Sequence, residues 1–123
     1  MRLINTFNAE YFGIPLNYQK TLDTVFWIIE DGIGFVSECG FIGGVIVVDL
    51  IRDWTVLQEM GWYSTDRSGI KLLDAFVRAG LDRTVDEVRV CTLETSSPIA
   101  GRILQRKGFA PLETSYRLIT GAN

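Results

Sequence analysis

The stretch from Glu59 to Leu73, EMGWYSTDRSGIKLL, constrains the fold more than any other part of the chain. It predicts an apolar strand that ends in a short polar loop, followed at once by a helix that begins at a glycine. Such a loop leaves backbone N–H groups unpaired at the positive end of the helix dipole, which favours an anion such as phosphate. Glu59 lies a few residues upstream, on the strand. A phosphate site and a carboxylate this close together indicate a phosphate-bearing cofactor and a reaction that needs a base.

Length and charge exclude several classes of protein. A chain of 123 residues is expected to form one domain, residues 1–123. The net charge of −3 argues against a general nucleic-acid binder, which needs a basic face. No apolar stretch is long enough to span a bilayer and no signal peptide is evident, so we expect neither a nucleic-acid nor a membrane partner. The two cysteines are expected to be free thiols in a reducing compartment.

The chain contains no histidine. This removes the usual Ser-His and Cys-His nucleophilic systems and most zinc sites, and we expect no metal. A general base must then be a carboxylate, lysine, tyrosine, cysteine or terminal amine. Cys91, on an expected central strand, is interpreted as a small buried apolar residue rather than a nucleophile.

Hydrophobic periodicity and turn residues predict an α/β fold with a mixed, mostly antiparallel sheet flanked by helices. Residues 1–13 have no clear period. The predicted helices run from Pro15 to Glu30, from Gly69 to Leu81, and from a Ser97-Pro98 start to Gly108. The predicted strands are Gly34 to Glu38, Phe41 to Ile51, Val56 to Ser64, Glu87 to Leu93 and a closing strand, Ser115 to Ile119.

Three stretches in this order resemble the GNAT N-acetyltransferases, as found in small bacterial and phage members. GFVSECGFIGGVIV is similar to the family's strand–turn–strand opening. Glu59-Met60-Gly61-Trp62-Tyr63 resembles the E-x-x-W-W/Y ending of its fourth strand, and SSPIAGRILQRKGFAPLETSYRLI resembles its closing segment. The resemblance covers residues 14–119. It implies a single GNAT-like domain, cytoplasmic, that uses acetyl-CoA as co-substrate and a primary amine as acceptor.

The resemblance also implies where acetyl-CoA binds, in a V-shaped gap between the strand ending near Ser64 and the strand starting near Glu87. Residues 63–65 would line the pantetheine arm, residues 67–71 would form the phosphate turn, and two serines would stand at the far wall. The implied cofactor residues are Tyr63, Ser64, Thr65, Arg67, Ser68, Gly69, Ile70, Lys71, Ser96 and Ser97.

Catalysis by direct transfer assigns Glu59 as the general base for the amine, activated by burial beside Trp62. A solvated or ion-paired strand carboxylate is the alternative for Glu59. Tyr116 and Tyr63 are the hydroxyls left to protonate the leaving thiolate, although tyrosines on strands more often fill the core.

The chain departs from the family pattern in three places. The phosphate loop is shorter and does not fit the family's glycine pattern, and Leu104 replaces the tyrosine that often acts as general acid. The amino-terminal element is shortened to residues 1–13. A GNAT-shaped protein that does not catalyse, and serves as a structural, virion or protein-binding module, therefore stays open, as do the acceptor and a homodimer.

Overall fold

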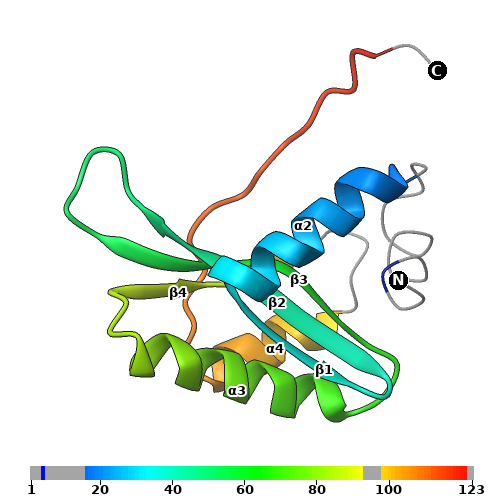
Figure 1. Cartoon of the computed structure of the whole chain (residues 1–123). Coiled ribbons are helices and arrows are strands. Elements are labelled where there is room, and N and C mark those ends of the chain that lie inside the picture. Colours follow the sequence, from blue (N-terminus) through cyan, green and yellow to red (C-terminus); the bar gives the residue numbers. More distant parts are fainter. Residues whose placement is uncertain (1–3, 5–15, 93–97, 122–123) are drawn as a thin grey trace.

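The computed structural model describes residues 4, 16–92 and 98–121, and a four-stranded sheet lies at its centre (Figure 1). The antiparallel pairs are β1–β2 and β2–β3, whereas β3 and β4 are parallel. The predicted α/β class with a mixed, mostly antiparallel sheet is thus confirmed. The strands, in their spatial order, are β1 (Ile33–Ser37), β2 (Gly40–Val48), β3 (Thr55–Ser64) and β4 (Glu87–Arg89).

Helices cover both faces of this sheet. Consecutive strand residues point to opposite faces, and a Cβ on Gly43 would meet Ile28 of α2 (Tyr18–Asp31) whereas a Cβ on Gly44 would meet Phe76 of α3 (Ser68–Asp82). α2 and α3 therefore lie on opposite sides. α4 (Pro98–Arg106) lies beside α3, where Lys107 and Asp74 form an ion pair at 2.9 Å.

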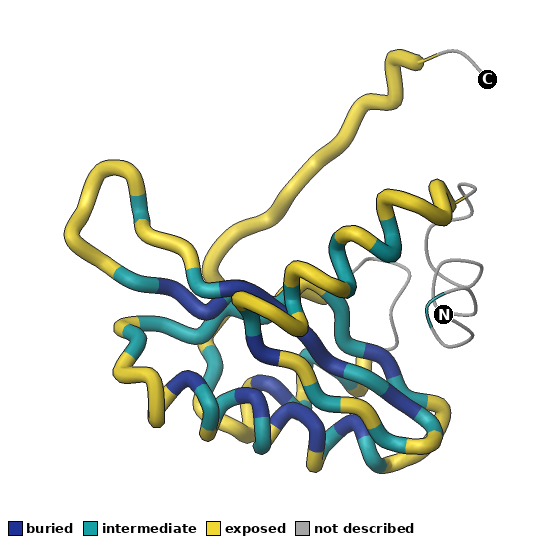
Figure 2. Tube along the Cα trace, in the orientation of Figure 1, coloured by how far each residue is buried: buried dark blue, intermediate teal, exposed yellow. Residues whose placement is uncertain are grey.

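The core is concentrated on the α3 side of the sheet. α3 carries its apolar residues on one face and buries Leu72, Leu73 and Phe76 completely or nearly so. Figure 2 shows these buried positions along α3 and the sheet. α2 has no buried residue, so it is the more loosely packed of the two layers.

Most predicted elements are found with ends shifted by a few residues, and two strands end earlier than predicted. β2 stops at Val48 rather than Ile51, because the Asp49 carboxylate accepts the N–H groups of Ile51 at 2.8 Å and Arg52 at 3.1 Å and closes a turn. Only part of β2 is covered on both faces, since Val48 is exposed. β4 ends at Arg89 rather than Leu93, for a reason described with the site below.

The predicted closing strand from Ser115 to Ile119 is wrong. After α4 the described residues form no helix or strand, and residues 110–121 are exposed throughout (Figure 2). Local strand propensity makes a strand only where a neighbouring edge supplies hydrogen bonds, and no described strand pairs with this segment. The predicted serine cap at Ser97 lies outside the described residues.

Within the described residues, no helix is long and apolar enough to cross a membrane.

Candidate functional site

The site begins where β3 and β4 separate. The two strands pair over three positions, from Val56 opposite Glu87 to Gln58 opposite Arg89. β3 continues for six residues beyond Gln58 and keeps only β2 as a neighbour among the described strands. The strands thus leave a gap, and residues 90–92 pair with none of the described strands, so β4 ends early.

A β-bulge coincides with this separation. Gly43 pairs with Gly61 and Gly44 pairs with Glu59, so Met60 is an extra residue on β3. A bulge bends its strand and increases the local twist, which turns the end of β3 away from β4. The close approach of β2 to β3 at the bulge requires glycine at position 44, because a Cβ there would overlap the Gln58 carbonyl oxygen. The bulge and Gln58 are features that the sequence analysis missed; the adjacent glycines at 43 and 44 are their one sequence signal.

Glu59 is the first residue beyond the paired region of β3 and β4. Its side chain is partly buried, and burial raises the pKa of its carboxyl group from 4.5 to about 8. No ion pair within the described part of the chain includes it. Glu59 is thus not ion-paired with a described residue, and a carboxyl group with this pKa exchanges a proton near neutral pH.

Cys91 lies across the gap, within electrostatic reach of Glu59. The thiol is partly buried although the residue as a whole is exposed, and this partial burial and the Glu59 charge both raise the pKa of the Cys91 thiol. The Gln58 amide joins the two strands, because its Nε2 donates to the Glu59 carbonyl oxygen at 3.0 Å and approaches Cys91 Sγ at 3.9 Å. Cys91 is exposed, contrary to the expected buried position, because the chain has left the sheet at this point. Both cysteines are free, as predicted.

The loop between β3 and α3 differs from the expected phosphate turn in its hydrogen bonds. The Thr65 N–H donates to the Cys39 carbonyl oxygen at 2.9 Å, and the Asp66 N–H to Ser64 Oγ at 3.1 Å. The Ser68 N–H donates to Asp66 Oδ1 at 2.8 Å, and the Ile70 N–H to the Arg67 carbonyl oxygen at 3.2 Å. The expectation that the loop amides face outward is wrong for these four.

Asp66 is the physical reason. Its carboxylate accepts from the Ser68 N–H and from Ser64 Oγ, and hydrogen bonds from Ser68 hold its pKa below the usual value. The negatively charged Asp66 carboxylate therefore lies at the positive end of the α3 dipole, where an incoming phosphate would bind. An aspartate two residues before the helix is a recognisable capping signal, which the sequence analysis did not use.

Part of the predicted phosphate site remains available. The N–H groups of Arg67 and Gly69 have no acceptor in the described part of the chain, and Gly69 is packed so closely that a Cβ would meet Ser64 Cβ at 2.9 Å. The side chains of Arg67 and Lys71 are exposed and form no ion pair with a described residue. Trp62 anchors this corner, since its Nε1 donates to the Gly69 carbonyl oxygen at 2.9 Å.

The two candidate tyrosines lie in different surroundings. Tyr63 is buried against Phe41, with ring centroids 6.1 Å apart, so it contributes to the core as a side chain. Tyr116 is 92% exposed on the segment after α4, and its side chain does not pack against Glu59. Ser96 and Ser97, the expected far wall of the gap, lie outside the described residues.

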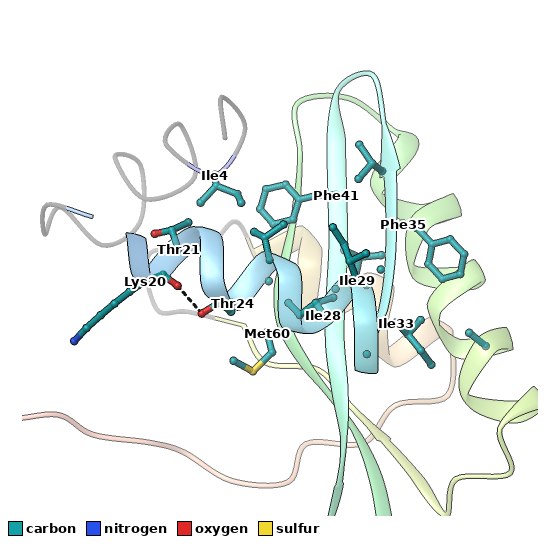
Figure 3. A pocket seen from close by; sticks show the side chains of 18 of the residues that line it. Ile4, Lys20, Thr21, Thr24, Ile28, Ile29, Ile33, Phe35, Phe41 and Met60 are labelled. Atoms are coloured by element: carbon teal, nitrogen blue, oxygen red, sulfur yellow. Dashed lines mark hydrogen bonds between the residues drawn. The ribbon is translucent and has the colours of Figure 1, made fainter. Parts of the chain in front are cut away.

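A cavity of about 810 Å³ opens between α2 and the sheet and extends to the bulge (Figure 3). Ile28 and Ile29 of α2 project into it, and Phe41 and Met60 approach it from β2 and β3. The hydroxyls of Thr21 and Thr24 bond back to carbonyl oxygens of α2 or its cap, at 2.8 and 2.9 Å. The cavity offers mainly apolar surface, and Lys20, Asp82 and Arg83 are the charged residues in its lining.

No group of three or more His, Cys, Asp or Glu side chains that could hold a metal ion occurs among the described residues.

No family model and no curated protein matches this sequence. Several solved structures are similar to it. A point mutant of TTHA1254 from Thermus thermophilus superposes with a TM-score of 0.68 at 21% identity, covering 94% of this chain and 89% of that one. An acetyltransferase from Trypanosoma brucei gives 0.65 at 13%, covering 91% and 86%, and a structure described as a probable acetyltransferase gives 0.68 at 12%, covering 91% and 84%. The chain therefore shares its fold with these structures, two of which are described as acetyltransferases.

Proposed function

We propose that this protein is an N-acetyltransferase that moves an acetyl group from acetyl-CoA directly to a primary amine. The observation that carries the proposal is the position of Glu59, a carboxyl group with a pKa of about 8, at the point where β3 separates from β4. A base with that pKa is matched to an ammonium substrate near neutral pH. The shared fold of proteins described as acetyltransferases supports the same reaction class.

In the proposed mechanism the thioester lies in the gap beside the free edge of β3. Ionised Glu59 accepts a proton from the acceptor amine, directly or through water. The amine nitrogen then attacks the thioester carbonyl carbon, a strand N–H near Tyr63 polarises the carbonyl oxygen, and the carbon–sulfur bond breaks. The leaving CoA thiolate takes up a proton. Because Tyr116 is exposed in its own chain, solvent is the proton source that this geometry favours.

The CoA diphosphate would bind at the loop before α3. Its donors would be the N–H groups of Arg67 and Gly69, with the cations of Arg67 and Lys71 nearby. Asp66 repels a diphosphate at this position, so we expect weaker CoA binding than an open cradle would give. Tyr63, Ser64 and Thr65 would contact the pantetheine arm, and Ser96 and Ser97 would lie at the far wall.

The acceptor amine would approach from the cavity beside Met60. Since that cavity is mainly apolar, we propose an acceptor whose amine is attached to an apolar group.

A binding measurement tests the proposal first. Thermal unfolding is followed with acetyl-CoA, with CoA and with ATP as a control for general phosphate binding. A thioester at a hundred times its dissociation constant should stabilise the protein by about 2.7 kcal/mol. The absence of any shift with acetyl-CoA and CoA would contradict the proposal.

An activity measurement tests the role of Glu59. Glu59→Gln should lower kcat for acetylation of an apolar amine by roughly 100-fold or more while leaving the affinity for acetyl-CoA nearly unchanged. In the wild type, activity should rise with pH through about 8, because only ionised Glu59 accepts a proton. Equal turnover in the variant would remove Glu59 from the mechanism.

The second candidate is a binding module of the same fold without activity. The specific observation in its favour is the Asp66 carboxylate, which occupies the helix terminus that phosphate would need. This candidate predicts no stabilisation by any thioester and no release of CoA with any amine, so the two measurements above separate it from the enzyme.

A further inference from the structure

The cavity between α2 and the sheet follows α2 along most of its length. The residues of α2 that line it recur at helical spacing, in one stripe on one face of the helix: Lys20, Thr21, Thr24, Val25, Ile28 and Ile29. No residue of α2 is buried, so α2 stands over the sheet without filling the space beneath this stripe. The cavity is therefore elongated, and its long direction is the axis of α2 (Figure 3).

One contact fixes where the bulge lies along α2. Gly43 pairs with Gly61, next to the extra residue Met60. A Cβ on Gly43 would meet Ile28 Cγ2 at 3.3 Å, so Ile28 lies over the part of the sheet that contains the bulge. Lys20 precedes Ile28 by two turns of the helix, which is about 12 Å at a rise of about 1.5 Å per residue. The cavity thus connects the candidate site with the first turn of α2.

The stretch between these two points is suited to a hydrocarbon chain. The hydroxyls of Thr21 and Thr24 donate to backbone carbonyl oxygens of the preceding turn, so neither has a proton left to donate to a ligand. Val25 lines the same stretch from α2, and Phe41 lines it from β2. An apolar chain gains free energy when it leaves water for such a surface.

Lys20 supplies a positive charge at the end of this stretch. Its side chain is exposed, extends away from the apolar side chains in Figure 3, and forms no ion pair with a described residue. The first turn of α2 contains no acidic residue, and the helix dipole adds to the positive charge there. The other charged residues of the lining are Asp82, which is ion-paired with Arg78 at 3.3 Å, and Arg83. At that end of the cavity charges of both signs are present, whereas the Lys20 end is positive.

We propose that the cavity selects ω-amino carboxylates, that is, acceptors in which an apolar chain separates the amine at the bulge from an anionic group at Lys20. The inference rests on the proposed acetyl transfer, because that reaction places the amine beside Glu59. A separation of about 12 Å corresponds to roughly ten carbons of an extended chain, given C–C bonds of about 1.5 Å. The charge at Lys20 then distinguishes these acceptors from plain alkylamines.

Calorimetric titration of the full chain tests chain length and charge together. The probes are ω-amino carboxylates of five, eight and eleven carbons, each compared with its ω-amino amide, which keeps the length but lacks the negative charge. We expect the eleven-carbon carboxylate to bind most tightly, and roughly two- to fivefold more tightly than its amide, as an exposed ion pair allows. Equal affinities for carboxylate and amide, or affinities that do not depend on length, would overturn the proposal.

A reversal of charge at Lys20 sharpens that test. Lys20→Ala should remove the preference for the carboxylate, and Lys20→Glu should reverse it, so that an α,ω-diamine of the same length binds better than the amino carboxylate. Arg102→Ala removes one positive charge from the exposed surface of α4 and should keep the wild-type preference. A preference for the carboxylate that survives in Lys20→Glu would overturn the assignment of the anion to Lys20.

A bulky side chain halfway along the cavity tests the path of the chain. Thr24 lies one turn from both Lys20 and Ile28. Thr24→Trp should weaken binding of the eleven-carbon probe roughly tenfold or more and leave the five-carbon probe nearly unaffected, because the short chain stays near the bulge. Gln19→Trp, at an exposed position of α2 outside the lining, is the matched control. Thermal unfolding verifies that both variants are folded, and equal effects of the two would overturn the proposed path.

Acetylation of the same probes by acetyl-CoA separates this inference from the function on which it rests. Acetylation of carboxylate and amide at equal kcat/KM would overturn the selectivity and leave the acetyl transfer standing. A preference for the carboxylate in binding, without transfer to any probe, would contradict the acetyl transfer and support the cavity as a site for ω-amino carboxylates.

Discussion

The two ends of β3 illustrate the difference between scaffold and candidate site within one strand. From Val56 to Gln58 the strand is paired on both edges, and Leu57 is fully buried against α3. From Glu59 onward it is paired on one edge among the described strands, and Met60 is 49% exposed. The paired end stabilises the fold. The other end holds the Glu59 carboxyl group in a partly buried position, where its ionised form is disfavoured. The bulge at Met60 divides the two.

The largest expected effect comes from truncating the paired end. Leu57→Ala should lower the free energy of unfolding by about 3 kcal/mol, because it leaves a cavity between the sheet and α3. Met60→Ala, three residues along, is the matched control and should cost less than about 1 kcal/mol, since half of its side chain is already in water. Urea unfolding of both variants measures the difference. Similar losses would mean that the two ends are equally part of the core.

The second effect is the dependence of stability on pH. The pKa of Glu59 is about 8 in the folded protein and near 4.5 when unfolded, so between these values the folded state holds a proton that the unfolded state has lost. The free energy of unfolding should therefore fall as pH rises across this window and level off above about 8. For a partly buried group we expect a decrease on the order of 2 kcal/mol.

Glu59→Gln provides the comparison for that prediction. The variant should lack this decrease, and above pH 8 it should be more stable than the wild type. Other carboxyl groups titrate equally in both proteins, so the difference between the two curves isolates Glu59. Parallel curves from pH 5 to pH 9 would show that Glu59 ionises normally and does not have the raised pKa.

A third, smaller effect concerns Asp66. Asp66→Asn keeps a side chain that can cap α3 but removes the charge that competes with phosphate. Affinity for CoA should rise roughly two- to fivefold, the range expected when a charge of about 0.3–1 kcal/mol at a helix terminus is removed. Asp53→Asn, an exposed position in the turn after β2, controls for net charge. Isothermal titration calorimetry measures both, and a fall in affinity for the Asp66 variant would assign it a supporting role instead.

The smallest effect is expected at Lys71. Its exposed ammonium group should add about twofold to CoA affinity at low ionic strength and less as salt is added. Arg78→Ala, on the same helix but ion-paired with Asp82, is the control and should leave the affinity unchanged. A salt-independent loss in Lys71→Ala would indicate a direct contact rather than a screened charge.

Most of the fold could be predicted from the sequence, because helices and strands of this length leave a clear pattern of apolar residues. The period of α3 and the β-branched run of β2 place those elements to within a few residues. The segment from Ser115 to Ile119 shows where this fails. It alternates like a strand, yet no described strand of its own chain pairs with it, and pairing depends on residues distant in the sequence.

The candidate site was predicted in part. Glu59 was predicted from its place just upstream of the loop and from the resemblance of its strand to the E-x-x-W-W/Y pattern. Its catalytic role stays a prediction, which its raised pKa supports. The loop amides were not predicted correctly, because the prediction left out the capping role of Asp66, whose carboxylate accepts the Ser68 N–H. The roles of Tyr63, Ser64, Thr65, Arg67, Ser68, Gly69, Ile70, Lys71, Ser96, Ser97 and Tyr116 in cofactor binding or catalysis stay predictions.

The sequence by itself determined the class of fold, the succession of β3, loop and α3, and the absence of histidine chemistry. These follow from local pattern and composition. Only the tertiary structure decided where β3 and β4 part, that Glu59 sits at that point, and that Asp66 occupies the helix terminus. The physical reason is that strand separation, desolvation and competition for amides arise between residues that are distant in the sequence or hidden within a turn.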